Sequence, residues 1–318
     1  MRKWLSTGVS PARRFLNFII KLKRLLPKWT YRSPPNWYGY LLIGPAIILA
    51  SFLSAGLIIL GVLSFFTFDP FEFYLVELTF ENWRVLFTNE AYYVLFGRTF
   101  GLTILITTLS IACALPYSYL ITRAKSSLIR KLLLFSIFVP FFTGVIIRTY
   151  GWIVVLGRNG LVNSFFALFG LGPFRLLGNE IGVVLGLLQV MIPFAVIMIT
   201  PALQNIEQNL EMAAESLGAT RIQAFRYIVL PLSLPGVGAA TVVVFTITSA
   251  RFAIPGLLGR GQVDFVANVI HSTIFGQSNY PLAATFSITL VAISSVVVWL
   301  VFSKVGIGTL GLEEDKNE

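Results

Sequence analysis

Two arginines interrupt long apolar segments of the sequence and are the residues best suited to chemistry. Arg148 stands in "IIRTYGW" and Arg251 in "ARFAIP", and both segments are otherwise uncharged. A charged side chain inside a membrane is costly and usually faces a cavity or a partner. We therefore expect both guanidinium groups to line a route for a polar solute, and their charge favours a carboxylate or a phosphate.

Each arginine also has a structural interpretation. Arg148 can snorkel outward or bind a loop carbonyl, and Arg251 can pair with an acid on another chain. Four further residues are candidates for the same route. They are Tyr150, Gln189, Thr248 and Phe252. Tyr150 is also typical of an interfacial aromatic belt, and Ser and Thr in membrane helices often bond their own backbone or a neighbouring helix.

Helices that cross a membrane must position these residues. Of the 318 residues, 56% are hydrophobic and 12% are charged, and the mean hydropathy is +0.81, which soluble domains do not reach. About 20 apolar residues cross the hydrocarbon core as a helix. Apolar runs therefore predict an all-α integral membrane protein with six transmembrane helices, the third interrupted by Arg148. The runs are 33–68, 99–122, 132–157, 181–206, 227–250 and 265–303.

The basic residues predict the orientation of the chain. Nine of the 24 Lys and Arg lie in residues 2–32, where no acid occurs. Because positive residues accumulate on the cytoplasmic side, we expect both termini in the cytoplasm. Residues 13–26 separate apolar from basic side chains, which predicts an interfacial amphipathic helix, with a disordered leader as the alternative. The net charge of +10 then indicates membrane lipid as a partner and not nucleic acid.

No linker divides the chain, so we expect one membrane domain. A basic segment occupies residues 1–36, the six-helix domain residues 37–306 and a cytoplasmic tail residues 307–318. A short surface helix is expected around residues 80–88. The single cysteine, Cys113, is expected to be packed in the second span. The single histidine, His271, has no companions for a metal site, so no metal is expected.

Residues 204–235 predict a compact helix–turn–helix between the fourth and fifth spans. Gly218 ends the first helix, and Thr220 with Gln223 begins the second with a capping box. Pro231 and Pro235 are expected to break the second helix before the fifth span. On the first helix, one face holds Ile206, Leu210, Ala213, Ala214 and Leu217, and another holds Glu207, Glu211 and Glu215. Such a rigid knob suits insertion into a groove on a cytoplasmic partner, and a simple connecting loop is the alternative.

The stretch "AAESLGATRIQAFRYIVLPLSLPG" resembles the EAA loop of permease subunits of binding-protein-dependent ABC importers. The Glu that opens the family pattern falls on Met212, and Glu211 and Glu215 are the nearby charges. The resemblance implies that this loop, at about residues 204–235, is a coupling helix docked on an ATPase. The implied coupling residues are Glu211, Met212, Ala213, Ala214, Glu215, Gly218, Ala219, Phe225, Leu230 and Pro231.

Other segments look like the spermidine/putrescine-type branch of this family, which also includes permeases for opines and phosphonates. They are "ENWRVLFTNEAYYVLFGRTFGLT", "RTYGWIVVLGRNGLVN", "GLLQVMIPFAVIMITPALQNI" and "RFAIPGLLGRGQVDFVANVI". In this branch the stretch at Ala250–Pro255 often reads G-[DE]-F-x-x-P, with an acid where Arg251 stands. The reversed charge favours an anionic or zwitterionic solute over a polyamine.

The resemblance implies a permease subunit of the bacterial inner membrane that moves a small polar solute by ATP-driven alternating access. The implied partners are a second permease subunit, two ATPase subunits and a periplasmic solute-binding protein. The sequence has no G-x-x-x-x-G-K-[ST] phosphate loop, so ATP and Mg are expected on the ATPase subunits, and this chain is expected to bind no cofactor and to be no enzyme. The alternative is an ATP-independent secondary transporter or channel, which predicts intramembrane acids or internal repeats.

Overall fold

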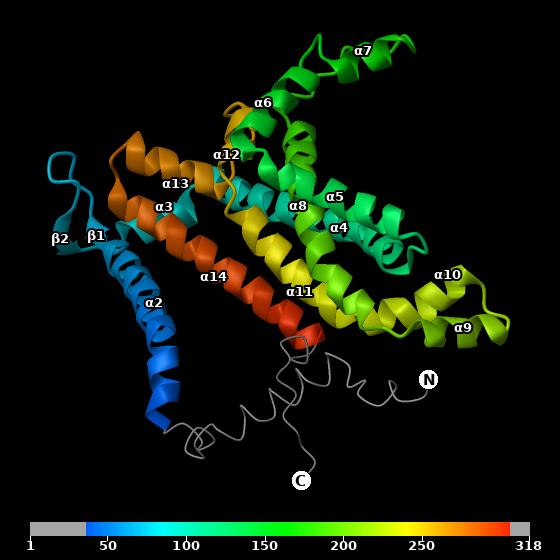
Figure 1. Ribbon diagram of the computed structural model, residues 1–318. Coiled ribbons are helices and arrows are strands. Elements are labelled where there is room, and N and C mark those ends of the chain that lie inside the picture. The colour runs from blue at the N-terminus through cyan, green and yellow to red at the C-terminus, as the bar shows by residue number, and fades with distance from the viewer. Residues whose placement is uncertain (1–35, 306–318) are drawn as a thin grey trace, which may run out of the picture. The chain divides into compact units, whose positions relative to one another are not determined.

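The computed structural model describes the backbone of residues 36–305 and the side chains of residues 43–303 (Figure 1). The amphipathic helix expected at 13–26 and the tail expected at 307–318 lie outside the described residues. The chain divides into two compact units, Met1–Leu57 and Ile58–Glu318, and helix α2 (Asn36–Leu63) crosses the boundary. The candidate site residues all belong to the second unit.

Within the described residues, five helices are long and apolar enough to cross a membrane. They are α2, α4 (Glu90–Arg123), α8 (Glu180–Gln204), the run from α10 into α11 (Arg221–Ser249) and α14 (Tyr280–Val305). The remaining expected span, the third along the chain, is a pair of helices, α5 (Ser127–Phe142) and α6 (Val145–Val155), bent by 98° at their junction. Pro140 and Gly144 flank the bend, and both residue types disfavour a continuous helix.

Short elements join the long helices. Strands β1 (Phe66–Thr67) and β2 (Leu75–Leu78) pair antiparallel, a small exception to the all-α prediction. Helix α3 (Glu81–Thr88) confirms the surface helix expected around 80–88. The remaining elements are α7 (Leu161–Ala167), α9 (Gln208–Ser216), α10 (Arg221–Ala224), the π-helical turn η2 (Phe225–Val229), α11 (Leu230–Ser249), α12 (Ala253–Gly259) and α13 (Val266–Phe275).

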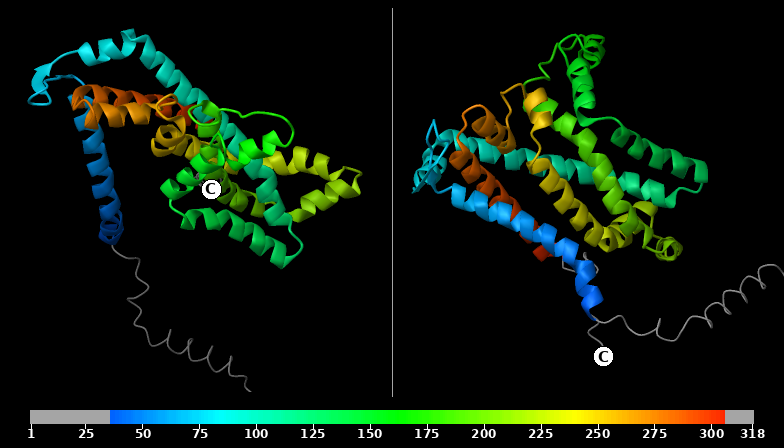
Figure 2. Two further views of the ribbon diagram at one scale, coloured as in Figure 1. Left: turned by 90° about the horizontal axis from the view of Figure 1, so that it is seen from above. Right: turned by 60° about the vertical axis from the view of Figure 1, so that its left-hand side comes forward.

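Helices α4, α8 and α11 form the centre of the second unit, and each packs on the other two (Figures 1 and 2). Their contact buries Ile106 of α4, Met191 and Ile199 of α8 and Val244 of α11 completely. A second apolar cluster, centred on Phe286, joins α3, α4, α13 and α14. The central three-helix contact connects the two ends of the unit at which the candidate residues lie.

Two glycines let helices approach α8 closely. A Cβ at Gly236 of α11 would lie 2.2 Å from the Cβ of Ala202, and a Cβ at Gly186 of α8 would lie 2.3 Å from Leu258 Cδ1 of α12. Neither position has room for a larger side chain unless a neighbouring helix or side chain moves. By contrast, Cys113 is exposed on α4, so the expectation that it is packed is wrong. Its apolar surroundings on the helix face suit contact with lipid or with another chain.

Candidate functional site

The bend between α5 and α6 forms one wall of a cavity of about 210 Å³. Residues 140–148 of the bent pair line it on one side, and Val190, Pro193 and Phe194 of α8 line it on another. Arg251, just after the end of α11, completes the lining. The cavity is therefore assembled from three separate helical segments of the second unit.

Arg148 and Arg251 both line this cavity although they are more than 100 residues apart in the sequence. The Nε atom of each is buried and has no hydrogen-bond partner within residues 36–305. No acidic residue contributes to the lining. A buried donor without a partner costs free energy, so this pair of guanidinium groups favours an incoming anion.

Helix irregularities add backbone donors to the same cavity. Helix α6 begins at Val145, and Gly144 before it supplies no side-chain cap for the first N–H groups. The N-terminus of a helix carries partial positive charge and unpaired N–H groups. Arg251 itself lies in the break between α11 and α12. Broken helices whose ends point into a cavity are a common way to build a solute site in transporters.

The other four predicted pathway residues lie outside the lining of this cavity. Gln189 accepts a hydrogen bond from Trp152 Nε1 at 2.7 Å, which ties α8 to α6. Tyr150 is exposed, and Phe252 stacks on His271 with 5.6 Å between ring centroids. Thr248 is fully buried and donates to the carbonyl of Val244.

The cavity also contains residues that were not predicted from the sequence, namely Phe141, Thr143 and Gly144. The signal that points to them is the Pro140–Gly144 spacing inside an apolar run, which marks a broken helix. The expectation that His271 binds no metal stays a prediction. Within the described residues, no group of three or more His, Cys, Asp or Glu side chains is placed to hold a metal ion. The His271 ring lies between Phe252 and Phe275.

The predicted helix–turn–helix is present and is formed by α9, α10 and η2, which we call the hairpin. Gly218 has φ of 93° at the turn, where Gly218 N donates to Glu215 O and Ala219 N to Ala214 O. These two bonds form the usual glycine-terminated helix end. The Thr220–Gln223 capping box is also present, with bonds of 3.3 and 2.8 Å. The hairpin is therefore rigid at its tip.

The expected break at Pro231 and Pro235 is wrong. The chain passes from α10 through η2 into α11 as one helical run, Arg221–Ser249. The amide N–H of Leu230 donates to Phe225 O, five residues back, so η2 is a π-turn with one extra residue. Pro231 follows the π-turn directly, at a point where the regular α-helical bonding pattern is already interrupted. Pro235 lies within the apolar helix, where proline is tolerated.

The face of α9 that packs on this chain is the face with Glu211. Glu211 is only 9% exposed, whereas Leu217 is 91% and Met212 54% exposed. On the second arm of the hairpin, Ile222 is 78% exposed. Ala213 is exposed, whereas Ala214, Ala219, Phe225 and Leu230 are partly buried. The hairpin thus presents large apolar side chains outward and keeps a carboxylate inside.

Glu211 is held by two residues of α4. Its Oε2 accepts a hydrogen bond from the Tyr119 hydroxyl at 2.6 Å. Its Oε1 lies 2.7 Å from Arg123 Nε, which donates to it, and 2.6 Å from Arg123 Nη2. The Tyr119 ring also packs edge-on against Phe225 of η2. Sequence reasoning missed Arg123, which was read only as a positive residue at the end of a span. By contrast, the nearby Glu215–Arg221 pair is exposed and 3.7 Å apart.

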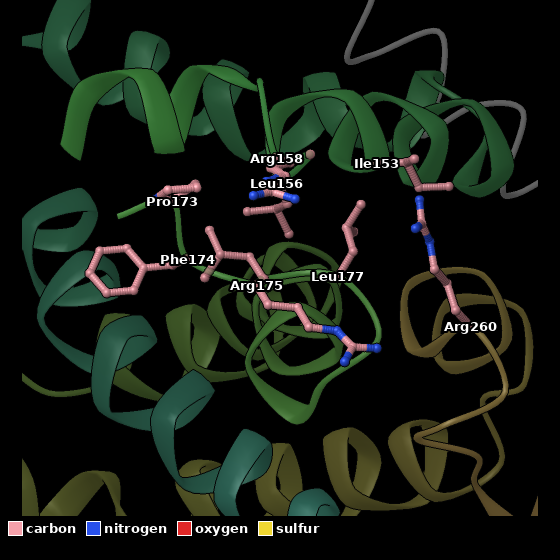
Figure 3. A pocket seen from close by; sticks show the side chains of 10 residues that line it. Ile153, Leu156, Arg158, Pro173, Phe174, Arg175, Leu177 and Arg260 are labelled. Atoms are coloured by element: carbon pink, nitrogen blue, oxygen red, sulfur yellow. The ribbon is translucent and has the colours of Figure 1, made fainter. Parts of the chain in front are cut away.

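A second cavity, of about 340 Å³, lies where α6 ends and α8 begins, and three arginines line it (Figure 3). They are Arg158, Arg175 and Arg260, and all three are exposed. Arg175 Nη2 donates to Gln262 Oε1 at 2.7 Å. This basic cavity and the hairpin lie at opposite ends of α8, which is about 37 Å long at 1.5 Å per residue.

Several apolar spans, a solute-sized cavity among them and a projecting hairpin define the class of multi-pass membrane permeases. Residues 106–305 match the family described as "Binding-protein-dependent transport system inner membrane component". The chain therefore belongs to this family, and it is a permease of the ABC transporter type in the inner membrane.

Curated relatives cover most of the chain. The chain is 31% identical over 252 residues to the spermidine/putrescine transport system permease protein PotB of Haemophilus influenzae, which covers 79% of this chain and 87% of that protein. It is 30% identical over 288 residues to the inner membrane ABC transporter permease protein YdcU of Escherichia coli, with 86% and 91% covered. Both relatives are named as permease proteins.

A solved structure shares the fold. It is a bacterial ABC transporter involved in the import of the acidic polysaccharide alginate, with a TM-score of 0.69 and 19% sequence identity. The match covers 94% of this chain and 100% of that chain. The six expected spans therefore belong to a known ABC permease fold.

Proposed function

We propose that this chain is the permease subunit of an ABC importer for a small anionic or zwitterionic solute, which passes through the Arg148–Arg251 cavity. The observation that carries the proposal is the convergence of two guanidinium groups, each with a buried Nε lacking a partner in the described chain, on a cavity without acids. The uncapped start of α6 adds positive potential there. A carboxylate, phosphonate or phosphate would supply the missing acceptors.

The position of Arg251 supports this solute class over a polycation. The pattern that this stretch resembles in the polyamine branch has an acid at the position of Arg251, where it would suit a cationic solute. A second positive group beside Arg148 would repel spermidine, because like charges in a poorly solvated cavity repel strongly. A solute with at least one negative group is attracted by both side chains.

A polyamine is the second candidate solute. The observation in its favour is the resemblance to proteins named as spermidine/putrescine permeases, at 31% identity for the Haemophilus influenzae protein. Under this proposal acids on a second permease subunit would pair with Arg148 and Arg251 and neutralise the cavity. The two candidates therefore differ in the expected effect of changing the charge at position 251.

We also propose that the hairpin docks on an ATPase subunit at the cytoplasmic face. The exposed apolar side chains of Met212, Leu217 and Ile222 support this, because exposed apolar patches mark interaction sites. With both termini in the cytoplasm, the three-arginine cavity at the other end of α8 faces the periplasm and is available to a solute-binding protein. A second permease subunit and a second ATPase subunit complete the proposed assembly.

In this assembly ATP and Mg bind the ATPase subunits, and this chain contributes movement and not catalysis. Hydrolysis would drive alternating access to the cavity through the hairpin. The alternative of a secondary transporter or channel predicts uptake without an ATPase subunit. Uptake that persists after the ATPase subunits are removed from the reconstituted system would favour that alternative.

The test is uptake into proteoliposomes that contain the complete transporter and its binding protein. Radiolabelled spermidine, an opine and an alkylphosphonate are each offered to wild type and to Arg251→Gln, Arg251→Lys and Arg251→Asp. We expect uptake of an anionic compound that falls about tenfold in Arg251→Gln and is largely kept in Arg251→Lys, the size of effect for one lost ionic contact. Arg84→Gln on the exposed side of α3, which lines neither cavity, is the matched control for loss of one positive charge.

The outcome that contradicts the proposal is specific. Wild-type uptake of spermidine that exceeds uptake of every anionic compound, and that Arg251→Asp leaves unchanged, assigns the cavity to polyamines. Thermal-shift screening of the binding protein against the same compounds provides an independent check, because that protein makes the first selection of solute.

A further inference from the structure

The hairpin is joined to the membrane helices by a buried ionic cluster of Tyr119, Arg123 and Glu211, which we call the latch. Arg123 is the last residue of α4, and Glu211 lies in the middle of α9. The guanidinium group contacts Glu211 Oε1 from Nε at 2.7 Å and from Nη2 at 2.6 Å. The Tyr119 hydroxyl donates to the other carboxylate oxygen at 2.6 Å. Both carboxylate oxygens are therefore bound, and the orientation of α9 against α4 is fixed.

Arg123 also contacts a third element. Its Nη2 donates to the carbonyl of Ile206 at 3.0 Å, directly after the end of α8. One side chain thus holds the end of α4, the end of α8 and the middle of α9 together. Tyr119 adds a contact with η2 through the ring of Phe225, at 5.1 Å between centroids. Any displacement of α9 must move these helix ends with it or break charged hydrogen bonds.

The latch is poorly explained as a device for stability alone. The side chains of Arg123 and Glu211 are only 15% and 11% exposed. Burial of two charges costs about as much as their attraction returns, and an apolar pair of similar volume is often as stable. An ion pair, unlike an apolar pair, provides directed hydrogen bonds that fix one geometry. That property matters where an external force must be passed from one element to another.

We infer that the latch is the contact through which movement of the hairpin reaches α4 and α8. The inference rests on the proposed function, in which an ATPase displaces the hairpin. The route continues along α8, which packs on α4 over much of its length and lines the Arg148–Arg251 cavity with Val190 and Pro193. Tyr119, Arg123 and Glu211 are positioning residues, and none of them touches the solute.

The same geometry excludes Glu211 from contact with the ATPase while the latch is closed. Its charge is used inside the chain, although it lies next to Met212, where the family pattern has its Glu. The carboxylate on the exposed side of α9 is that of Glu215, whose partner Arg221 is itself exposed. Because Glu215 is among the implied coupling residues, the control for the latch is Glu207, an exposed acid that directly precedes α9 and is not among them.

The test measures whether nucleotide alters the cavity, and it needs no solute. In the complete transporter, Cys113 is replaced by Ser and Thr143 in the cavity by Cys, so that N-ethylmaleimide reports access to this chain at one site. Labelling rates are compared without nucleotide and after trapping with ATP and vanadate. Glu211→Gln and Arg123→Gln are introduced singly, Glu211→Arg is combined with Arg123→Glu, and Glu207→Gln is the control.

We expect the nucleotide-dependent change in labelling rate to fall about fivefold or more in Glu211→Gln and Arg123→Gln, the lower end of usual coupling effects. ATP hydrolysis continues in these variants, and the exchanged pair recovers part of the change. Glu207→Gln behaves as the parent protein does. If a single variant does not assemble, Tyr119→Phe, which removes one hydroxyl, is used, and a clear reduction is again expected.

Two failures can be told apart. If the parent protein shows no nucleotide effect at Thr143→Cys, the proposed ATP-driven function is wrong and the latch has nothing to transmit. If the parent responds and Glu211→Gln, Arg123→Gln and Tyr119→Phe respond equally, the latch alone is overturned. Equal losses in Glu211→Gln and Glu207→Gln also overturn it, because they assign the effect to the charge of this region and not to the buried contacts.

Discussion

Arg123 and Arg251 occupy similar places in the sequence and opposite environments in the structure. Each lies at the C-terminal end of a central apolar helix. Arg123 is the last residue of α4, and Arg251 lies two residues beyond α11. Arg123 donates to both Glu211 and the carbonyl of Ile206. The buried Nε of Arg251 has no acceptor anywhere in the described chain, and its neighbour in the cavity is another arginine.

The difference teaches how to distinguish a structural arginine from one reserved for a ligand. A chain that supplies its own carboxylate satisfies the charge and gains a fixed contact between elements. A chain that leaves the charge unsatisfied bears a cost in stability, which a bound anion removes. Removal of the contact made by the first kind of arginine should therefore lower stability, whereas removal of the second kind should impair transport without a loss of stability.

Removal of the latch carboxylate is expected to have the largest effect on stability. Glu211→Ala leaves Arg123 partly buried without its counter-ion, and we expect the free energy of unfolding to fall by about 3 kcal/mol. Titration of the purified chain with dodecyl sulfate, followed by circular dichroism, measures the change. Glu215→Ala is the control, with a loss below about 0.5 kcal/mol for an exposed pair. Similar losses in the two variants would remove the distinction drawn here.

Close helix packing provides the next test, because one tight glycine contact lies near each end of α8. Gly236 faces Ala202 near the hairpin, and Gly186 lies near the start of α8. Gly236→Ala places a methyl group 2.2 Å from the Cβ of Ala202, which cannot rotate away, and we expect a loss of about 2 kcal/mol. Gly186→Ala meets the end of the Leu258 side chain at 2.3 Å, which can turn aside, so its loss should be smaller. Thermal melting in the same detergent compares them, and the reverse order would contradict the packing described.

A change at Arg251 should act in the opposite direction to Glu211→Ala. Arg251→Met removes an unsatisfied buried donor, and we expect unfolding free energy that is unchanged or higher by about 1 kcal/mol. Uptake of the anionic solute should nevertheless be lost. The same dodecyl sulfate titration, paired with the uptake assay, measures both quantities. A loss of stability as large as that of Glu211→Ala would show that Arg251 is a structural arginine.

The smallest expected effect concerns the turn that presents α9. Gly218 has φ of 93° and open space around its Cβ position, so Gly218→Ala should cost only the strain of a left-handed residue, about 1 kcal/mol. Gly61 lies in helix α2, also with open space, and Gly61→Ala should be neutral or stabilising by about 0.5 kcal/mol. Two losses of equal size would show that the turn geometry contributes nothing.

Much of the fold was predictable because it depends on local patterns. The apolar runs located every long helix, and Gly218 with Thr220 and Gln223 located the two arms of the hairpin. The 98° bend at α5–α6 was not predicted, since the third span was expected to be interrupted only at Arg148. Pro140 and Gly144 permit a break in a helix without dictating its angle. The strands β1 and β2 were missed because six residues in two short runs carry almost no periodic signal.

The sites were less predictable because they depend on contacts between distant segments. Arg148 and Arg251 were each predicted to line a pathway, but nothing in the sequence indicated that they share one cavity. On α9, periodicity identified an apolar face and an acidic face, and the buried side is the one with Glu211. Burial there follows from the position of Arg123 on α4, and the apolar face is left for a partner that the sequence does not contain.

The π-turn η2 sets the rotational phase between the hairpin and α11. Because each residue of an α-helix turns the chain by about 100°, the one extra residue in Phe225–Val229 rotates every outward-facing side chain of the hairpin by that amount relative to the membrane helix. Deletion of a single residue here would leave both helices intact and turn Ile222 away from its present direction. A hairpin exchanged between relatives must therefore match in residue count as well as in sequence, or its docking face will point the wrong way.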